Sequence, residues 1–413
     1  MAKKITLLLL CIVSSIHWAL AQNNFSISGT VKDKRESLPG AAIYVSGYKI
    51  ATTTNNEGKF LLPNLAPGNY DILVQMIGYL PYSKNIIISD KSVNFDILLT
   101  ENATLLKEVV IKPDPNRAYY LALFKDFFIG KTPNAQECKI LNTEVIIIDD
   151  NKTESKLTAR ATDFIVVENK ALGYRIKYLL NYFEYDYKLK MIFYAGNTSF
   201  EEMKGSNAKQ KKWLKNREIA YNGSIQHFYK SLYHNTIAEE GFIINKITKI
   251  PNKNRPSDSL INASVKRLTS GQNGTINIIT FNGNDSLSYW LKKRKEPKEF
   301  SVVSRKDVLV DTLVKKVDEN LKMIKYADEL YISYKKEKES ASFNVSGLKQ
   351  NRPADLSDYQ ISVVELLQPH ISFYPNGAVL DPKSALYKGY WAYEKVADMV
   401  PMDYLNLVLK KKK

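Results

Sequence analysis

Residues 25–79 read FSISGTVKDKRESLPGAAIYVSGYKIATTTNNEGKFLLPNLAPGNYDILVQMIGY. Apolar and polar side chains alternate over the first eight of these residues, and the alternation returns at Tyr70, Ile72, Val74 and Met76. Successive side chains of a β-strand point to opposite faces of its sheet. The pattern therefore predicts short strands with one buried face and one face in water.

Turn signals separate these strands. The NNEG sequence of residues 55–58 predicts a hairpin, because Asn and Gly tolerate the positive φ angles of tight turns. The LAPG sequence of residues 65–68 predicts a second turn, and further strand patterns follow at residues 86–88 and 93–99. Short strands at this close spacing are typical of an antiparallel β-sandwich of the immunoglobulin or transthyretin type.

Several motifs of this stretch occur in an order and spacing that resemble the carboxypeptidase regulatory-like domain family. The motifs are SGTV at 28–31, LPGA at 38–41, TNNEGKF at 54–60, LAPGNY at 65–70, IGY at 77–79 and LKEVVI at 106–111. The resemblance covers residues 25–112 and implies a transthyretin-like sandwich without peptidase chemistry or catalytic residues. In Gram-negative bacteria such domains often precede TonB-dependent outer-membrane receptors or other envelope modules.

Residues 1–21 predict a cleaved export signal. Lys3 and Lys4 form a basic start, residues 5–19 are apolar, and the ALA sequence at 19–21 is a small-x-small cleavage site. An uncleaved membrane anchor is the alternative, but the apolar run is short for a bilayer span. We therefore expect a mature chain that begins at Gln22 and lies in the periplasm, at the outer membrane or on the cell surface of a Gram-negative bacterium.

The chain is basic, with 59 Lys and Arg against 43 Asp and Glu and a formal net charge of +16 at pH 7. In a cytosolic protein this charge would suggest nucleic acid, but export excludes that partner. The charge suits anionic lipid or polysaccharide surfaces. Basic runs at residues 209–212, 292–295 and 410–413 are candidates for such contacts, and solvated helix faces are the alternative interpretation.

The domain boundary is predicted at a linker, residues 113–116, because two prolines there prevent a strand from continuing. Residues 22–112 are then the sandwich, residues 117–404 a β-rich α+β domain with a few helices, and residues 405–413 a basic tail. The fold class is therefore mainly β with an α+β second domain. Apolar residues recur at spacings of three and four over residues 117–130, which predicts a helix that covers the sheet of the second domain.

Strand and helix patterns alternate within the second domain. Residues 174–187 are rich in tyrosine and predict strands on which tyrosines pair across a half-buried sheet, with a carbohydrate-stacking surface as the alternative. Helices are predicted at residues 209–221 and 225–232, the second capped by Ser224. Further strands are expected at residues 260–266, 276–281 and 301–313, and a charged loop at residues 292–298. Residues 321–335 fit a helix or a strand, and the period of two at their end favours the strand.

Metal-binding motifs are absent from the sequence. A zinc peptidase needs a His-x-x-Glu pair and a third protein ligand, and none of His227, His234 and His370 begins such a pair. His227 and His234 would share a helix face, but a metal there would need Glu239 or Glu240 as a third ligand. Burial of His227 in the core is the alternative interpretation.

Motifs for nucleophilic and acid catalysis are also absent. Cys138 is the single cysteine of the expected mature chain, and we expect it to be buried and structural. Gly-x-Ser-x-Gly does not occur, and the Ser-x-x-Lys sequences lack partner motifs. Asp149, Asp150 and Asp381 could serve a glycosidase only if the fold brought carboxylates together. The sequence therefore assigns no catalytic, metal-binding or cofactor-binding residue.

These observations favour a non-enzymatic cell-envelope protein. Its sandwich would be an interaction or spacer module, and its second domain would bind an envelope protein or a glycan. A set of short segments resembles exported proteins of unknown function that carry a regulatory-like domain in front, which assigns no chemistry. The segments are residues 220–224, 226–228, 231–232, 240–242 and 389–404. Two alternatives stay open: a hydrolase of envelope polymers or polysaccharides with acidic residues in the second domain, and a periplasmic accessory of a TonB-dependent outer-membrane transporter.

Overall fold

The computed structural model describes residues 25–102, 115–269, 286–354 and 356–404. The predicted export signal, the motif at residues 106–111, the expected strand at 276–281 and the basic tail lie outside the described residues. Residues 113 and 114 of the predicted linker lie outside them as well.

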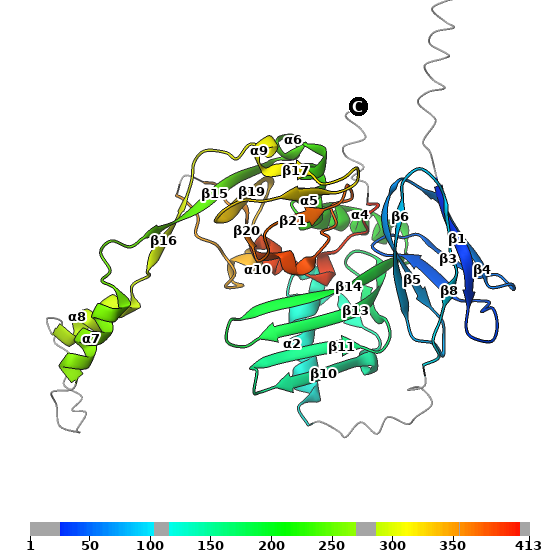
Figure 1. The fold of residues 1–413 in the computed structure, drawn as a ribbon, viewed down its shortest axis with the longest axis horizontal. Coiled ribbons are helices and arrows are strands. Elements are labelled where there is room, and N and C mark those ends of the chain that lie inside the picture. Colours follow the sequence, from blue (N-terminus) through cyan, green and yellow to red (C-terminus); the bar gives the residue numbers. More distant parts are fainter. Residues whose placement is uncertain (1–24, 103–114, 270–285, 355, 405–413) are drawn as a thin grey trace, which may run out of the picture.

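The first part of the chain is the predicted β-sandwich, which lies at the right in Figure 1. One sheet has the order β4-β1-β7, with β8 also paired to β1, and the other has the order β3-β2-β5-β6. Short parallel pairings join β1 to β7 and β8, and the remaining pairs are antiparallel. Fully buried Ile27, Ile43, Leu62 and Ile72 belong to the core between the sheets. The strands are β1 (Phe25–Lys32), β2 (Ala42–Val45), β3 (Ala51–Thr53), β4 (Lys59–Leu65), β5 (Gly68–Gln75), β6 (Tyr82–Ile88), β7 (Val93–Asn94) and β8 (Ile97–Leu98).

We call the sheet that follows the sandwich in the chain the second sheet. It has the order β10-β11-β13-β12-β9, with β14 also paired to β13, and helix α2 (Arg117–Phe128) covers one of its faces. The rings of Phe124 and Phe183 lie 4.9 Å apart, and those of Phe128 and Tyr178 lie 4.8 Å apart. Such buried aromatic pairs hold the helix on the sheet, as predicted. The strands are β9 (Cys138–Ile140), β10 (Ile146–Asn151), β11 (Lys156–Ala161), β12 (Ile165–Asn169), β13 (Tyr174–Asp186) and β14 (Met191–Glu202).

We call the antiparallel sheet that comes next in the chain the third sheet. It has the order β16-β15-β19-β20-β22, and a small sheet beside it has the order β17-β18-β21. The predicted helices α4 (Asn207–Tyr221) and α5 (Ile225–His234) are confirmed, and Ser224 caps α5 by accepting a hydrogen bond from the backbone of His227. The strands are β15 (Phe242–Pro251), β16 (Glu299–Val303), β17 (Val314–Lys316), β18 (Lys322–Ile324), β19 (Glu329–Lys338), β20 (Tyr359–Leu366), β21 (Ile371–Phe373) and β22 (Ala385–Gly389).

Short helices complete the described part of the chain. They are α3 (Pro133–Gln136), α6 (Ile237–Glu240), α9 (Val310–Leu313), α10 (Ala341–Asn344) and α11 (Tyr390–Tyr393), together with the 3-10 turns η2 (Thr143–Val145), η3 (Pro382–Ser384) and η4 (Val396–Asp398). No helix among the described residues has the length and apolar character needed to cross a membrane.

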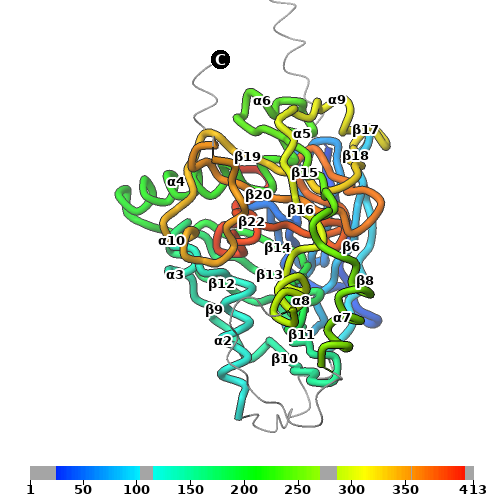
Figure 2. Tube along the Cα trace, turned by 90° about the vertical axis from the view of Figure 1, so that its left-hand side faces the viewer, coloured from blue at the N-terminus to red at the C-terminus, as the bar shows by residue number. Residues whose placement is uncertain are grey.

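The ends of β15 and β16 continue beyond the third sheet as a ribbon that carries α7 (Asp258–Thr269) and α8 (Ser286–Lys295). We call the described residues 247–269 and 286–303 the arm. It projects from the body at the left in Figure 1 and lies nearest the viewer in Figure 2.

Three predictions for this region are wrong. Residues 260–266 are helical rather than extended, and most of the expected loop at 292–298 belongs to α8. Only the first three residues of the expected strand at 301–313 are in β16, and its end is helix α9. Short apolar runs fit a strand or one face of a helix equally well, and here pairing between α7 and α8 selects the helix.

The C-terminal segment, residues 390–402, joins all three parts of the molecule. Trp391 Nε1 donates a hydrogen bond to the carbonyl of Gly223 at 2.6 Å, below the third sheet. Asn169 of the second sheet donates to the carbonyl of Ala397 at 2.8 Å. The backbone N–H of Met402 donates to the carbonyl of Gly47 in the sandwich at 2.6 Å.

The sandwich contacts the second sheet through the turn that contains Gly47. The N–H of Gly47 donates to the carbonyl of Thr198 at 2.6 Å, and Gln75 Nε2 donates to Asp163 at 2.9 Å. Gly47 has a φ angle of +80°, and a Cβ atom there would lie 2.8 Å from Cγ of Met402. Glycine is therefore required at this position both by the backbone angle and by the close approach.

Asp398 anchors the C-terminal segment to the second sheet. This buried carboxylate accepts hydrogen bonds from Thr132 Oγ1 at 3.0 Å, from Asn134 Nδ2 at 2.9 Å and from the N–H of Lys395 at 3.3 Å. We expect Asp398→Ala to lower the free energy of unfolding by about 2–5 kcal/mol, because it leaves buried donors without an acceptor. Denaturant unfolding measures this change.

Asp358 supplies the control for that measurement. Its carboxylate is 59% exposed and pairs with Lys338 at 3.1 Å on the surface. Exposed ion pairs add little stability, so Asp358→Ala should leave the unfolding midpoint nearly unchanged. Equal losses in the two variants would contradict the anchoring role of Asp398.

Candidate functional site

A cavity of about 360 Å³ lies beside the C-terminal segment, between the second and third sheets. Its volume falls at the lower end of the range of small-molecule pockets. Its lining is mostly apolar and aromatic, with a few ionisable groups. The lining includes Tyr178, Phe193, Tyr194, Ile225, Val379, Leu386, Tyr387, Trp391, Glu394, Lys395, Asp398 and Met399.

The aromatic wall of the cavity comes from three elements. Tyr178 and Tyr194 project from the second sheet, Tyr387 lies on β22, and Trp391 lies at the start of the C-terminal segment. The Tyr387 hydroxyl donates to the hydroxyl of Tyr229 at 3.1 Å. Trp391 donates its ring N–H to the carbonyl of Gly223, as described above. Hydrogen bonds therefore hold both rings in place, and their apolar faces line the cavity.

Glu394 is a carboxyl group without a compensating charge. Burial raises its pKa well above the ordinary value, and the negative charges of Asp398 and Glu337 raise it further. No cation or hydrogen-bond donor among the described residues lowers it. Burial therefore favours the protonated form of the Glu394 carboxyl group, which can donate a hydrogen bond.

Lys395 is the adjacent residue and presents an amine. Burial lowers its pKa to about 8, and no described carboxylate compensates for this shift. Its side chain packs against Gly130, and Nζ lies 5.9 Å from the centre of the Tyr194 ring. Because the pKa is still above 7, the amine is mostly charged at neutral pH.

Asp398 differs from both because its carboxylate is already engaged. Burial raises its pKa to about 6, while hydrogen bonds from Asn134, Lys395 and Thr132 act in the opposite direction. Asp398 is therefore mostly ionised at pH 7, and its oxygens are occupied by protein donors. The cavity thus offers two groups that are not paired with another described side chain: the Glu394 carboxyl, in which burial favours the protonated form, and the Lys395 amine.

His227 does not serve as a metal ligand in this arrangement. Nδ1 accepts a hydrogen bond from the N–H of Gly223 at 3.1 Å, so Nε2 carries the proton and donates to Glu240 at 3.2 Å. The ring is 2% exposed, and burial lowers its pKa. The structure brings together the predicted pair of His227 and Glu240, but both ring nitrogens are used within the core.

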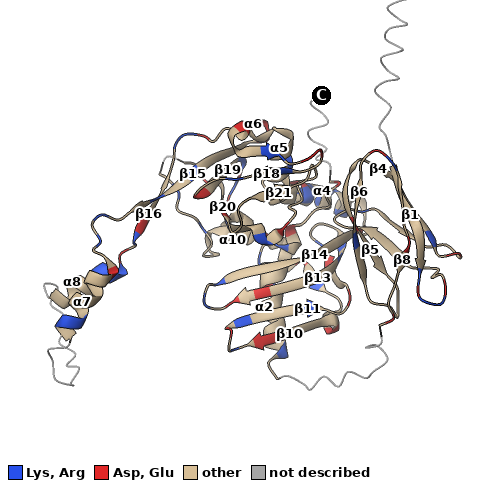
Figure 3. Ribbon diagram, in the orientation of Figure 1, with Lys and Arg blue, Asp and Glu red and all other residues tan. Residues whose placement is uncertain are grey.

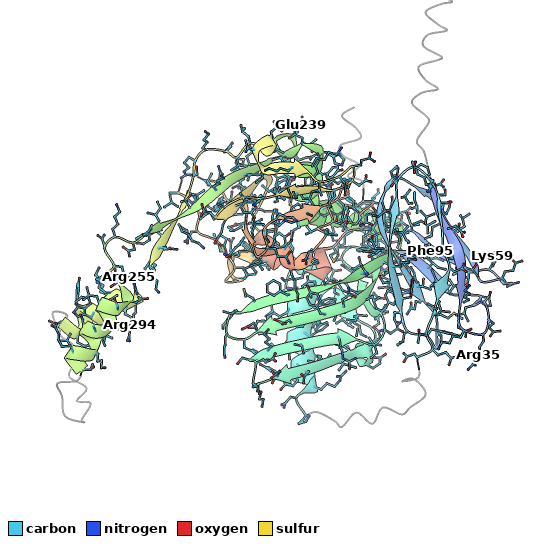
Figure 4. All side chains as sticks on the ribbon, viewed as in Figure 1. Arg35, Lys59, Phe95, Glu239, Arg255 and Arg294 are labelled. Carbon is cyan, nitrogen blue, oxygen red and sulfur yellow. The ribbon has the colours of Figure 1, made fainter. Side chains whose placement is uncertain are left out.

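The other histidines lie apart from this pair. His234 Nε2 contacts the carbonyl of Pro375 at 3.2 Å, and His370 is exposed after β20. Glu239 is exposed at the top of the molecule, where Figure 4 labels it. Across the described ranges, no group of three or more His, Cys, Asp or Glu side chains could hold a metal ion.

The remaining candidates have structural surroundings. Cys138 is buried as predicted, donates to the carbonyl of Asn134 at 3.3 Å, and has its pKa raised to about 12 by burial. Asp150 accepts hydrogen bonds from two tyrosine hydroxyls, Asp149 is exposed beside it, and Asp381 caps the turn η3 on another sheet. None of these three acids lines the cavity.

Two tyrosines of the tyrosine-rich strands are more deeply buried than the half-buried sheet that was predicted. Tyr174 and Tyr178 are 1% and 4% exposed, so they belong to the core of the second sheet. Tyr178 and Tyr194 also form part of the cavity wall.

Sequence reasoning missed Glu394, Lys395 and Asp398. A signal was present, because these three charges interrupt the otherwise apolar and aromatic sequence YWAYEKVADMVPM at residues 390–402. Charged residues within such a segment are costly to bury unless they are paired or functional. Nothing in the sequence indicated that residues 178–194 would lie opposite them.

Comparison with known proteins identifies the first part of the chain. Residues 27–111 match the family model described as CarboxypepD_reg-like domain. No curated protein matches the chain.

Solved structures give partial matches. A type II cohesin–X-dockerin complex from Acetivibrio cellulolyticus is 16% identical over 19% of this chain and 58% of that chain, with a TM-score of 0.18. A pilus 2b backbone protein of group B streptococcus is 18% identical over 20% and 43%, also with a TM-score of 0.18. A putative carbohydrate binding protein from Bacteroides uniformis is 13% identical over 37% and 57%, with a TM-score of 0.17. Each match spans less than two thirds of the other chain.

These structural matches carry no conclusion about function, but the family match and the two-sheet architecture agree. Residues 27–111 therefore form a CarboxypepD_reg-like domain, a non-catalytic, transthyretin-like β-sandwich.

Proposed function

We propose that the chain is an exported cell-envelope protein that binds a ligand in the cavity beside its C-terminal segment. The observation that carries this proposal is the pair of uncompensated side chains in an apolar cavity, Glu394 and Lys395. A buried polar group without a partner costs free energy. A ligand that supplies hydrogen-bond acceptors to Glu394 and Lys395 would offset this free-energy cost. This accounts for the presence of both groups in the cavity wall.

The chemistry of the cavity selects the class of ligand. Two donors require acceptors, and the charged Lys395 favours a carboxylate. The aromatic wall of Tyr178, Tyr387 and Trp391 favours an apolar or ring-shaped body. An acidic group on an envelope glycan or protein and a small free carboxylate share this chemistry, and the volume admits only one such group at a time.

The sandwich has a positional role in this proposal. It contacts the second sheet through Gly47 and Gln75 and contacts the C-terminal segment through Met402, as described above. The salt bridge between Lys49 and Glu202, at 3.0 Å, adds to this interface. These contacts support a module that holds the C-terminal segment in place, and they do not suit a freely moving spacer.

A matched pair of probes tests the cavity. We expect 4-phenylbutyrate to raise the melting temperature more than 4-phenylbutanol, which has the same ring and chain without the carboxylate. At ten times the Kd a ligand stabilises by about 1.4 kcal/mol, or about 3 °C for a protein of this size. Differential scanning fluorimetry measures the shift, and Trp391 in the cavity wall reports binding by its fluorescence.

Lys395→Met should remove the preference for the acid while retaining weak binding of the alcohol. Lys383→Met is the matched control, because this lysine lies outside the cavity, with Nζ 4.3 Å from the centre of the Tyr182 ring. A protein that responds to neither probe, or a Lys395→Met variant with an undiminished preference for the acid, would overturn the proposed site.

The pKa of Lys395 gives a separate prediction for pH. Phenylbutyrate binds the protonated amine, whose fraction falls about tenfold between pH 7 and pH 9 for a pKa of about 8. Affinity should therefore fall about tenfold over this interval, as measured by isothermal titration calorimetry. Lys395→Arg stays charged and should lose the pH dependence, and an equal fall in that variant would contradict this assignment.

A second candidate function is hydrolysis, because Glu394 and Asp398 place two carboxyl groups of raised pKa in one cavity. Paired acids of this kind catalyse glycoside hydrolysis when their separation is suitable. This candidate predicts release of nitrophenol from one of a panel of 4-nitrophenyl glycosides, with loss of activity in Glu394→Gln. The binding function predicts no release by either protein.

The third candidate function is that of an accessory protein of a TonB-dependent transporter. This candidate predicts that the chain co-purifies with an outer-membrane complex.

A further inference from the structure

The arm contains a helix that is not buried by the rest of the described structure. Ten residues form α8, including Leu287, Tyr289, Trp290 and Leu291, yet none of them is buried. Tyr289 is 52% exposed, and Leu260 on the neighbouring helix α7 is 51% exposed. A helix in a soluble protein normally buries its apolar face, so the contact between α7 and α8 leaves part of this face uncovered.

The ribbon of β15 and β16 that carries the two helices also has partly exposed apolar side chains. Ile250 of β15 pairs with Phe300 of β16, and the two side chains are 44% and 50% exposed. Val302, two residues along the same face, is 45% exposed. Partly exposed apolar side chains therefore extend from the ribbon to the helices, over an element that projects from the body (Figure 1).

Positive charge accompanies these apolar side chains. In the sequence, residues 252–298 contain nine Lys and Arg against three Asp and Glu. Arg255 pairs with Asp258 at 2.6 Å and Lys293 with Glu296 at 3.0 Å. Lys292, Arg294 and Lys295 in the last turn of α8 have no ion pair with a described residue. Figure 3 shows basic residues on the arm, and Figure 4 labels Arg255 where the ribbon meets the helices and Arg294 on α8.

We infer that the arm binds the surface of an anionic lipid bilayer. Lys292, Arg294 and Lys295 supply attraction to anionic headgroups, and Tyr289, Trp290 and Leu260 supply side chains that enter the interface between headgroups and acyl chains. Exposed basic residues alone would also suit an anionic polysaccharide. The half-exposed aromatic and aliphatic side chains distinguish the arm, because they gain free energy only by leaving water.

The projection of the arm makes this contact sterically possible. Both helices lie beyond the edge of the third sheet and clear of the sandwich (Figures 1 and 2). A flat surface can therefore meet α7 and α8 without displacing the body or closing the cavity. The inference does not depend on the proposed ligand site, because no residue of the arm lines the cavity.

Vesicle co-flotation tests this inference with the chain that begins at Gln22, so that the apolar export signal does not contribute. We expect binding to vesicles of phosphatidylcholine with 30% phosphatidylglycerol, weak binding to pure phosphatidylcholine, and loss of binding in high salt. Each basic residue near an anionic surface contributes about fivefold to affinity. The triple variant K292Q/R294Q/K295Q should therefore bind about 100-fold more weakly.

Helix α4 supplies a matched control. Lys209, Lys211 and Lys215 are exposed on this helix, so K209Q/K211Q/K215Q removes the same charge from a different surface. We expect the control variant to bind vesicles like the parent chain. An equal loss in both triple variants would show attraction by net charge alone and overturn the assignment to the arm.

Tryptophan fluorescence tests insertion independently of charge. Trp213 and Trp391 are 6% and 3% exposed, whereas Trp290 is only partly buried. Anionic vesicles should therefore shift the emission to the blue, and Trp290→Phe should abolish the shift while leaving co-flotation intact. Binding to a soluble acidic polysaccharide such as alginate without a blue shift on vesicles would favour a glycan and overturn the lipid proposal.

Discussion

The buried carboxylate of Asp398 holds together parts of the chain that are far apart in sequence. Its hydrogen bond to Thr132 spans 266 residues and fixes the turn η4 against the start of the second sheet. Trp391 and Met402, on either side of this anchor, extend the same segment to the third sheet and to the sandwich. One segment of 13 residues thus contacts all three parts of the molecule and adds to the direct contacts between the sandwich and the second sheet.

The cavity is a consequence of this arrangement. The C-terminal segment passes between two sheets and contributes Val396, Ala397 and Val400 to one hydrophobic core and Trp391 to the other, and the cavity lies beside it. Glu394 and Lys395 lie in this segment and cannot reach bulk water as freely as surface residues can. Their shifted pKa values follow from that position, and the same burial makes them capable of strong interactions with a ligand.

The sequence was informative where local patterns decide structure. Alternation and turn residues predicted the sandwich, and spacing predicted α2 and α5, because these elements bury one face with a regular period. The arm was predicted poorly, since residues 260–266 fit either a strand or a helix until α8 is placed beside them. The cavity was not predicted at all, because Tyr178 and Glu394 meet only through long-range packing, which no local pattern encodes.

The late position of the C-terminal segment also bears on the order of assembly. A chain made from its amino terminus can complete the sandwich before residues 390–402 are available, because both sandwich sheets are formed by residues 25–98. The other two sheets must wait for that segment before they can take up their final relation. Contacts of such long range form slowly, so this interval is when the unfinished molecule is most exposed to chaperones and proteases.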